Sequence, residues 1–189
     1  MNATMTKTIV IYHGNCADGF TSAWVAHKIF GDEATYVRGI HGDPIDWLDV
    51  TDATVYLLDF SYSREVMENM AKSAAKVIIL DHHVSAKNKI EPLLNDGTIS
   101  GVFDMNRSGA MITWDYFNPD DEAPALVKYV QDRDLWQFKL EYSVELNMGV
   151  FSYDYTFENW DELELKFCSC DIMMQSHLSG ALNHNYLQE

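Results

Sequence analysis

Short apolar runs of strand type alternate with helical patterns through the first half of the chain, and this alternation constrains the fold most strongly. The strand-type runs lie at residues 7–12, 35–38, 54–58, 76–80 and 100–104. Apolar residues at helical spacing occupy the segments 19–30, 63–74 and 85–94 between them. Such alternation predicts an α/β fold with a mainly parallel sheet that is flanked by helices on both faces.

From residue 108 onward the pattern becomes helical, with helices expected at residues 108–117, 124–132, 143–153 and 157–167. We therefore expect a sheet domain followed by a helical C-terminal region. Both belong to one domain over residues 1–160, and residues 161–189 form a tail without an assigned structure.

Side chains of metal-ligand type follow three of the strand-type runs. They are His13, Asp18, Asp59, Asp81, His82 and His83. Parallel sheets place their ligand sites at the carboxyl ends of the strands. The sequence therefore predicts that these residues share one site.

Imidazole and carboxylate groups suit Mn, Fe or Zn, and carboxylate-rich sites favour harder ions such as Mn or Mg. We expect two Mn²⁺ ions, with Mg²⁺, Fe²⁺ or Zn²⁺ as alternatives. Two ions about 4 Å apart need a bridging carboxylate, and Asp59 is the expected bridge because it follows a mid-sheet strand. A further acid from the segment 131–134 would complete the second ion, and Asp132 and Asp134 are equal candidates.

Four motifs occur in order along the chain, at residues 13–23, 57–59, 80–83 and 131–136, and Asn106-Arg107-Ser108-Gly109-Ala110 opens a helix before the last. In this order they resemble the DHH phosphoesterase superfamily, named for Asp81-His82-His83 as they stand here. The resemblance covers about residues 7 to 160 and is to a short, single-domain member of oligoribonuclease type. The superfamily includes exonucleases, short-oligonucleotide nucleases, cyclic-dinucleotide phosphodiesterases and related pyrophosphatases.

The resemblance implies a metal role for four of the residues. His13 and Asp59 match ligands of one ion, while Asp18, Asp59 and His82 match ligands of the second.

The resemblance also implies which residues meet the substrate. His83 matches the residue that faces the scissile phosphate, and Asp81 matches an acid that orients a neighbouring imidazole. Arg107 offers a bidentate fork for an anion, and the helix start at Ser108 and Gly109 offers backbone N–H groups to a phosphate. The competing interpretation is that Ser108 only caps this helix.

The chain departs from the family pattern in two places. Cys16 stands where the first motif commonly has an aspartate. It either ligates as a thiolate, which favours Zn or Fe, or is a small buried residue with water in the ligand position. This sequence also contains no Gly-Gly-His motif of the kind found in the substrate-binding domain of many members, so we expect an oligomer partner or the C-terminal helices to complete the pocket.

Charge and composition restrict the partners. A formal net charge of −16 argues against a long nucleic-acid groove, although bound cations would still allow a small anionic substrate. No run approaches the ~18 apolar residues of a membrane span. The odd number of cysteines, three, argues against a disulfide framework, so we expect a cytoplasmic protein without membrane contact.

The remaining aromatic and imidazole side chains are interpreted without a role in chemistry. His27 is expected in the core or at its boundary, and His41 in a loop. The tryptophans Trp114, Trp136 and Trp160 are expected in the core.

The leading hypothesis is a metal-dependent phosphodiesterase that hydrolyses a short oligonucleotide or small nucleotide by in-line attack of metal-bound hydroxide. A pyrophosphatase or phosphomonoesterase with the same two-metal site is the first alternative. A catalytically degenerate nucleotide-binding module is the second, and it is supported only by Cys16.

Overall fold

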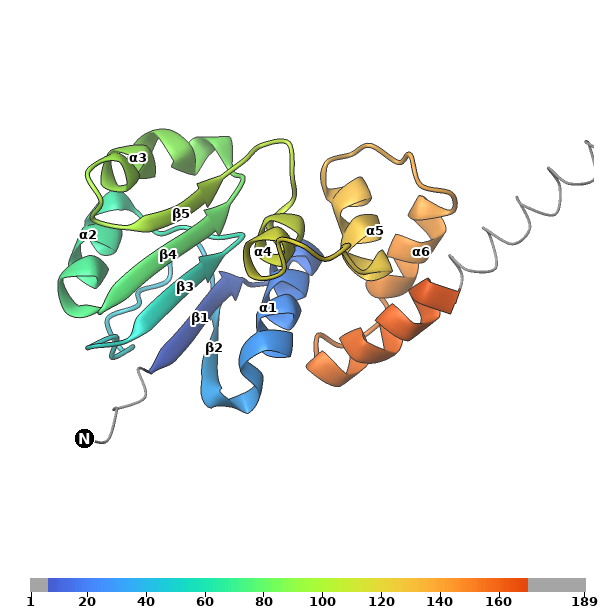
Figure 1. Cartoon of the computed structure of the whole chain (residues 1–189), viewed down its shortest axis with the longest axis horizontal. Helices are drawn as coiled ribbons and strands as arrows, with labels where there is room; N and C mark the ends of the chain where they lie inside the picture. The colour runs from blue at the N-terminus through green and yellow to red at the C-terminus, as the bar shows by residue number, and fades with distance from the viewer. Residues whose placement is uncertain (1–6, 170–189) are drawn as a thin grey trace, which may run out of the picture.

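A parallel sheet with its flanking helices forms one side of the structure, a computed structural model that describes residues 7–169, and the later helices form the other side (Figure 1). Its strands are β1 (Thr8–His13), β2 (Ala34–Gly39), β3 (Thr54–Leu58), β4 (Lys76–Asp81) and β5 (Ser100–Phe103). Their order in the sheet is β2-β1-β3-β4-β5, and every neighbouring pair is parallel. The predicted α/β fold is confirmed.

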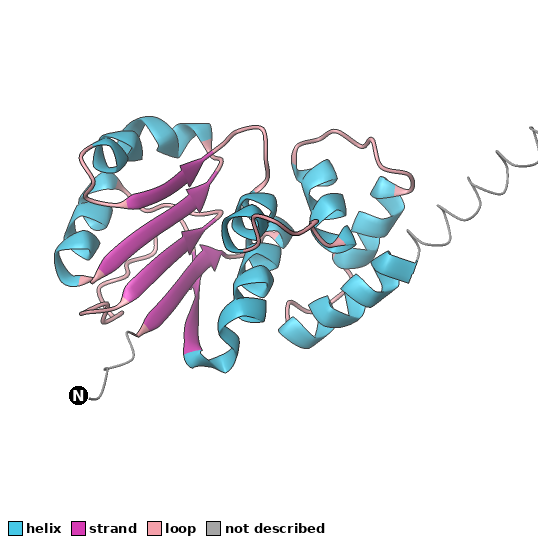
Figure 2. Cartoon of the chain, viewed as in Figure 1, coloured by secondary structure: helices cyan, strands magenta, loops and turns pink. Residues whose placement is uncertain are grey.

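Helices cover both faces of this sheet, as Figure 2 shows. One face is covered by α1 (Ala17–Phe30) and α4 (Gly109–Phe117), and the other by α2 (Arg64–Ser73) and α3 (Val84–Asn95). Helices α5 (Ala125–Asp134) and α6 (Ser143–Val150) lie beside the sheet, where α5 contacts α1 and α4 (Figure 1). A short 3-10 turn, η1, occupies Gly31–Glu33. Residues 157–169 form a further helix. None of the helices within residues 7–169 is both long and apolar enough to cross a membrane.

Two apolar layers, one on each face, stabilise the sheet. Val10 packs with Trp24 of α1 in one layer, whereas its neighbours Ile9 and Ile11 pack with Met67 of α2 in the other. This alternation follows from the two-residue period of a strand. Because both faces are covered, the strands are near-continuous runs of Val, Ile and Leu, which is typical of parallel sheets.

The order in which successive strands are added to the sheet reverses at β1, so that β2 and β3 lie on opposite sides of it. The connection from β1 through α1 leads to β2 on one side, while β3, β4 and β5 follow one another on the other side. Such a switch point leaves a crevice at the carboxyl ends of the two strands, where ligands bind in open α/β sheets. His13 ends β1 and Asp59 follows β3, so both lie at this crevice.

The C-terminal helix, residues 157–169, belongs to the same core as α1. Trp160 is fully buried, its Nε1 donates to Thr21 Oγ1 at 2.8 Å, and its ring meets Phe20 at 4.7 Å. The domain boundary expected at residue 160 therefore falls inside a packed helix, with Leu163 and Phe167 also buried. Of the tail expected at 161–189, residues 170–189 lie outside the described residues.

Two further expectations have clear outcomes. His27 stacks on Phe157 with ring centroids 4.0 Å apart, which confirms its packing role. Core burial is wrong for Trp136, which is 77% exposed. The reason is that α5 ends at Asp134, and the loop that follows turns Trp136 outward with a positive φ of 55°.

We predict that Trp160→Ala lowers the free energy of unfolding by about 3–5 kcal/mol, because it leaves a large cavity between the C-terminal helix and α1. Trp47→Ala is the matched control, since Trp47 is 66% exposed, and it should change stability by less than about 1 kcal/mol. Urea denaturation followed by circular dichroism measures both. Equal, small effects would show that the C-terminal helix does not share the core.

Candidate metal centre

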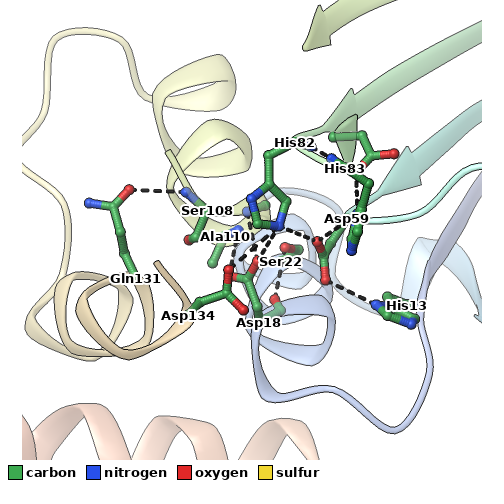
Figure 3. Close-up of polar contacts among 12 residues, drawn as sticks. His13, Asp18, Ser22, Asp59, His82, His83, Ser108, Ala110, Gln131 and Asp134 are labelled. Atoms are coloured by element: carbon green, nitrogen blue, oxygen red, sulfur yellow. Dashed lines mark hydrogen bonds and ion pairs between the residues drawn. The ribbon is translucent and has the colours of Figure 1, made fainter. Parts of the chain in front are cut away.

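Asp59 occupies the middle of a cluster of acids and imidazoles at the switch point (Figure 3). Its φ of 54° lies in the left-handed region, which aspartate tolerates better than most residues, and its N–H donates to Leu80 O at 2.8 Å. The side chain is only 1% exposed. Its Oδ2 lies 3.4 Å from His13 Nδ1 and its Oδ1 lies 3.1 Å from His82 Nε2, so the two oxygens face opposite sides of the cluster.

Within residues 7–169, three groups of side chains bring possible ligand atoms within 4.8 Å of one another. The groups are His13, Cys16 and Asp59; Asp18, His82 and Asp134; and Asp59, His82 and His83. The first two groups have no residue in common, and Asp59 faces both. This arrangement suits two ions with one bridging carboxylate.

Helix α4 fixes the Asp18 carboxylate in place. Gly109 N donates to Oδ2 at 2.7 Å and Ala110 N donates to Oδ1 at 3.0 Å. The N-terminus of a helix stabilises negative charge, and each oxygen keeps a further acceptor site for a cation. Burial nevertheless raises the pKa of Asp18 well above its usual range, and the nearby charges of Asp59 and Asp134 raise it further.

His82 points its Nε2 atom into the carboxylates. Asp134 Oδ2 lies 3.5 Å away and Asp18 Oδ2 lies 3.7 Å away, in addition to Asp59. Burial lowers the pKa of His82, but the surrounding carboxylates outweigh it and raise the pKa to about 9. Negative charge is therefore in excess at this point of the structure.

Two buried atoms of the cluster have no hydrogen-bond partner. His13 Nδ1 and Asp59 Oδ1 are buried, and neither has a hydrogen-bond partner of acceptable geometry despite the short distances between them and their neighbours. Buried polar atoms are ordinarily satisfied, so such atoms indicate an additional binding partner. Imidazole and carboxylate atoms around an excess of negative charge fit a divalent cation.

Asp81 organises the backbone and ring of His83. Its Oδ1 accepts from His82 N at 2.7 Å and from His83 N at 3.1 Å, and lies 2.7 Å from His83 Nδ1. The hydrogen bond with Asp81 is the main cause that raises the pKa of His83. Asp81 thus acts on His83, and this contact leaves Nε2 of His83 available.

The structure distinguishes the two acids in the last turn of α5. Asp132 accepts from Lys139 N at 2.9 Å and from Leu140 N at 3.1 Å, so its carboxylate holds the loop after the helix. Asp134 lies in the cluster beside His82. Of the two candidates, Asp134 is the one that meets the other ligand-type residues.

Cys16 occupies the N-cap position of α1, without a side-chain hydrogen bond to the helix. Its sulfur lies within 4.8 Å of possible ligand atoms of His13 and Asp59. Burial raises the pKa of its thiol to about 12, with a further contribution from the Asp59 charge. The thiol is therefore protonated at neutral pH unless a cation displaces the proton.

In this structure other side chains accept hydrogen bonds from Arg107 and from the backbone of Ser108 and Gly109, whose contact with a phosphate stays a prediction. Arg107 donates from Nε to Asp104 at 2.8 Å and from Nη1 to Asp115 at 2.5 Å, so carboxylates occupy its fork. Ser108 N donates to Gln131 Oε1 and Gly109 N donates to Asp18, while Ser108 Oγ caps Met111 N. Asp104 is close to Arg107 in sequence, whereas Gln131 and Asp18 come from distant segments that a local motif does not reveal.

Two further residues, His41 and Gly109, lie against the cluster. His41, expected as a loop histidine, has its ring 5.5 Å from His13 and 4.6 Å from Phe60. It follows β2, so its position at a strand end was the available signal. Gly109 packs directly on Asp59, where an added Cβ would overlap the Asp59 Cβ atom.

No family model matches the chain. It is 29% identical over 167 residues to an uncharacterized protein of Acanthamoeba polyphaga mimivirus, and covers 39% of that protein with 81% of its own length. A crystal structure of an uncharacterized protein from Helicobacter pylori superposes with a TM-score of 0.55 at 17% identity, over 71% of this chain and 44% of the other. This superposition shows a shared fold, and the chain spans less than half of both proteins.

We predict that Asp134→Asn weakens Mn²⁺ binding by at least about tenfold, because it removes a charged ligand atom beside His82. Asp132→Asn should instead lower the free energy of unfolding by about 1–3 kcal/mol and leave Mn²⁺ affinity within a few-fold, because it weakens the acceptor of two backbone N–H groups. Calorimetric titration with Mn²⁺ and chemical denaturation separate the two effects. The reverse pattern would assign Asp132 to the metal centre.

Proposed function

We propose that the chain is a metal-dependent phosphoesterase that hydrolyses a phosphodiester bond in a short oligonucleotide or a small nucleotide. The position of Asp59 carries this proposal, because its two oxygens face two separate groups of ligand-type side chains. Two adjacent ions with one bridging carboxylate are the arrangement that in-line displacement at phosphorus uses.

The residues divide into two sets for this purpose. His13, Cys16 and Asp59 would hold one ion, and Asp18, His82 and Asp134 would hold the other. Bound divalent ions would polarise the phosphoryl group, lower the pKa of a water and stabilise the leaving oxygen. The donor set, with four carboxylate or imidazole residues besides the shared Asp59, favours Mn²⁺.

His83 supplies charge stabilisation from the protein. Its Nδ1 is fixed by Asp81, and the hydrogen bond raises its pKa, so the ring keeps a proton on Nε2 more readily than a free histidine. A protonated Nε2 can donate to a phosphoryl oxygen as negative charge develops there. Asp81 is a positioning residue, because it acts through the ring of His83 and the backbone of His82 and His83.

The charge of the chain favours a small substrate. Its formal net charge of −16 repels an extended phosphate backbone, whereas a short substrate meets only the local field of the centre. Bound cations reverse the sign of that local field.

We predict that the protein with Mn²⁺ cleaves bis-p-nitrophenyl phosphate and dinucleotides, and that Asp59→Asn lowers kcat by at least about a hundredfold while the fold is retained. Asp96→Asn is the matched control. Asp96 is exposed and lies between α3 and the start of β5, whereas the metal centre lies at the carboxyl ends of the strands. Its substitution should therefore leave the rate unchanged.

Colorimetric and chromatographic product assays give the result. Retained activity in Asp59→Asn would exclude the bridging role of this residue. Phosphate release from pyrophosphate without cleavage of dinucleotides would instead identify a pyrophosphatase.

A further inference from the structure

A cavity of about 380 Å³ lies next to the candidate metal centre and has no role in the chemistry described above. We call it the Arg38 pocket. It is lined by Tyr12, Asn15, Phe20, Arg38 and Tyr155. Its volume falls in the range of about 300–1,000 Å³ that is usual for small-molecule sites.

The pocket and the metal centre share one turn of the chain. Asn15 lies between the ligand candidates His13 and Cys16, and its φ of 62° is a left-handed conformation that asparagine accepts. Tyr12 and Arg38 are partners in the register of β1 and β2, so their side chains lie on the same face of the sheet. A group bound here would therefore be adjacent to one bound at the ions.

Arg38 is the cation of this pocket. Its guanidinium donates to the side-chain oxygen of Asn15, which fixes its orientation. Within residues 7–169, the lysines and arginines that lie within ion-pair distance of an acid are Lys28, Arg64, Lys87, Arg107, Lys128 and Lys166. Arg38 thus has no carboxylate partner in the described chain, although the protein is strongly acidic.

The other walls are aromatic and offer donors but no acid. The Phe20 ring lies 5.6 Å from Tyr12 and 5.3 Å from Tyr155, measured between ring centroids. The two tyrosines carry hydroxyl groups, and the remaining side chain, Asn15, has an amide NH₂ besides the oxygen that Arg38 uses. Donors around a guanidinium with flat apolar walls suit an anion attached to a ring system.

We propose that the Arg38 pocket binds a second phosphate group of the substrate, one that is not hydrolysed, together with part of its nucleoside. Arginine recognises phosphate through a planar fork, and no carboxylate competes for the Arg38 donors that Asn15 leaves unused. Preferred substrates are then short nucleotides that carry a terminal phosphate beside the scissile ester. This preference rests on the proposed function, whereas phosphate binding at Arg38 does not.

The binding test uses metal-free protein in EDTA, so that the metal centre cannot capture the ligand. Isothermal titration calorimetry compares adenosine 5′-monophosphate, adenosine and inorganic phosphate. The monophosphate should bind about tenfold more tightly than adenosine, and Arg38→Gln should remove that difference. Arg64→Gln is the control with the same charge change, because Arg64 lies on α2 and pairs with Glu68.

A second variant keeps the arginine and changes only its charge environment. Asn15→Asp is nearly isosteric, tolerates the left-handed backbone and places a carboxylate on the Arg38 guanidinium. It should also abolish the preference for the monophosphate over adenosine. Inorganic phosphate that binds as tightly as the nucleotide would show that the nucleoside contributes nothing and would overturn that part of the proposal.

Equal affinity of the wild type for monophosphate and adenosine would contradict phosphate binding in the Arg38 pocket. An affinity difference that Arg38→Gln leaves unchanged would contradict it too.

A kinetic experiment compares kcat/KM for a dinucleotide with and without a terminal phosphate. Arg38→Gln should bring the ratio of the two values from about ten to about one. Binding through Arg38 without hydrolysis of any phosphoester would reject the proposed function and keep the pocket. Hydrolysis with a ratio that Arg38→Gln leaves unchanged would reject the pocket alone.

Discussion

Three carboxylates converge on His82, those of Asp18, Asp59 and Asp134, and all are buried or half-buried. The rest of the site depends on how the fold compensates their negative charge. Unpaired charge is costly to bury, so each acid needs compensation. The α4 N-terminus compensates Asp18 through two backbone N–H groups, and the raised pKa of His82 places a positive charge among the three. What remains is an excess of negative charge that a divalent cation would neutralise.

The convergence of these carboxylates requires backbone conformations that few residue types adopt. Asn15 and Asp59 have positive φ where the chain leaves β1 and β3, and each is a residue type that tolerates the left-handed region. Gly109 allows α4 to approach Asp59 directly, which brings the helix N-terminus onto Asp18. Strained positions gather at functional sites because only a well-packed surrounding structure can hold them. Here that support comes from the buried strands and from the core that α1 shares with the C-terminal helix.

The sequence predicts the sheet and the location of the site well, because both follow from periodicity and from the rule that parallel strands present ligands at their carboxyl ends. Strand runs that end in His13, Asp59 and Asp81 need no long-range information to be recognised. The choice between Asp132 and Asp134 does need it, since both are acids at the end of one helix and only the loop at Lys139 distinguishes them.

Contacts of individual side chains are harder to predict from the sequence, for a related reason. Arg107 looks free in its motif, but Asp104 and Asp115 reach it from either side in the folded chain. Trp136 has the spacing of a core residue, yet a left-handed turn directs it to the surface. Conversely, Arg38 has no motif around it, and only the pairing of β1 with β2 places it beside the turn at Asn15.

Electron paramagnetic resonance during a titration with Mn²⁺ tests the central role of Asp59 most directly. A carboxylate that faces both groups of ligands should produce two Mn²⁺ ions per chain that are magnetically coupled through it. A single bound ion, or two ions without coupling, would contradict a bridging Asp59.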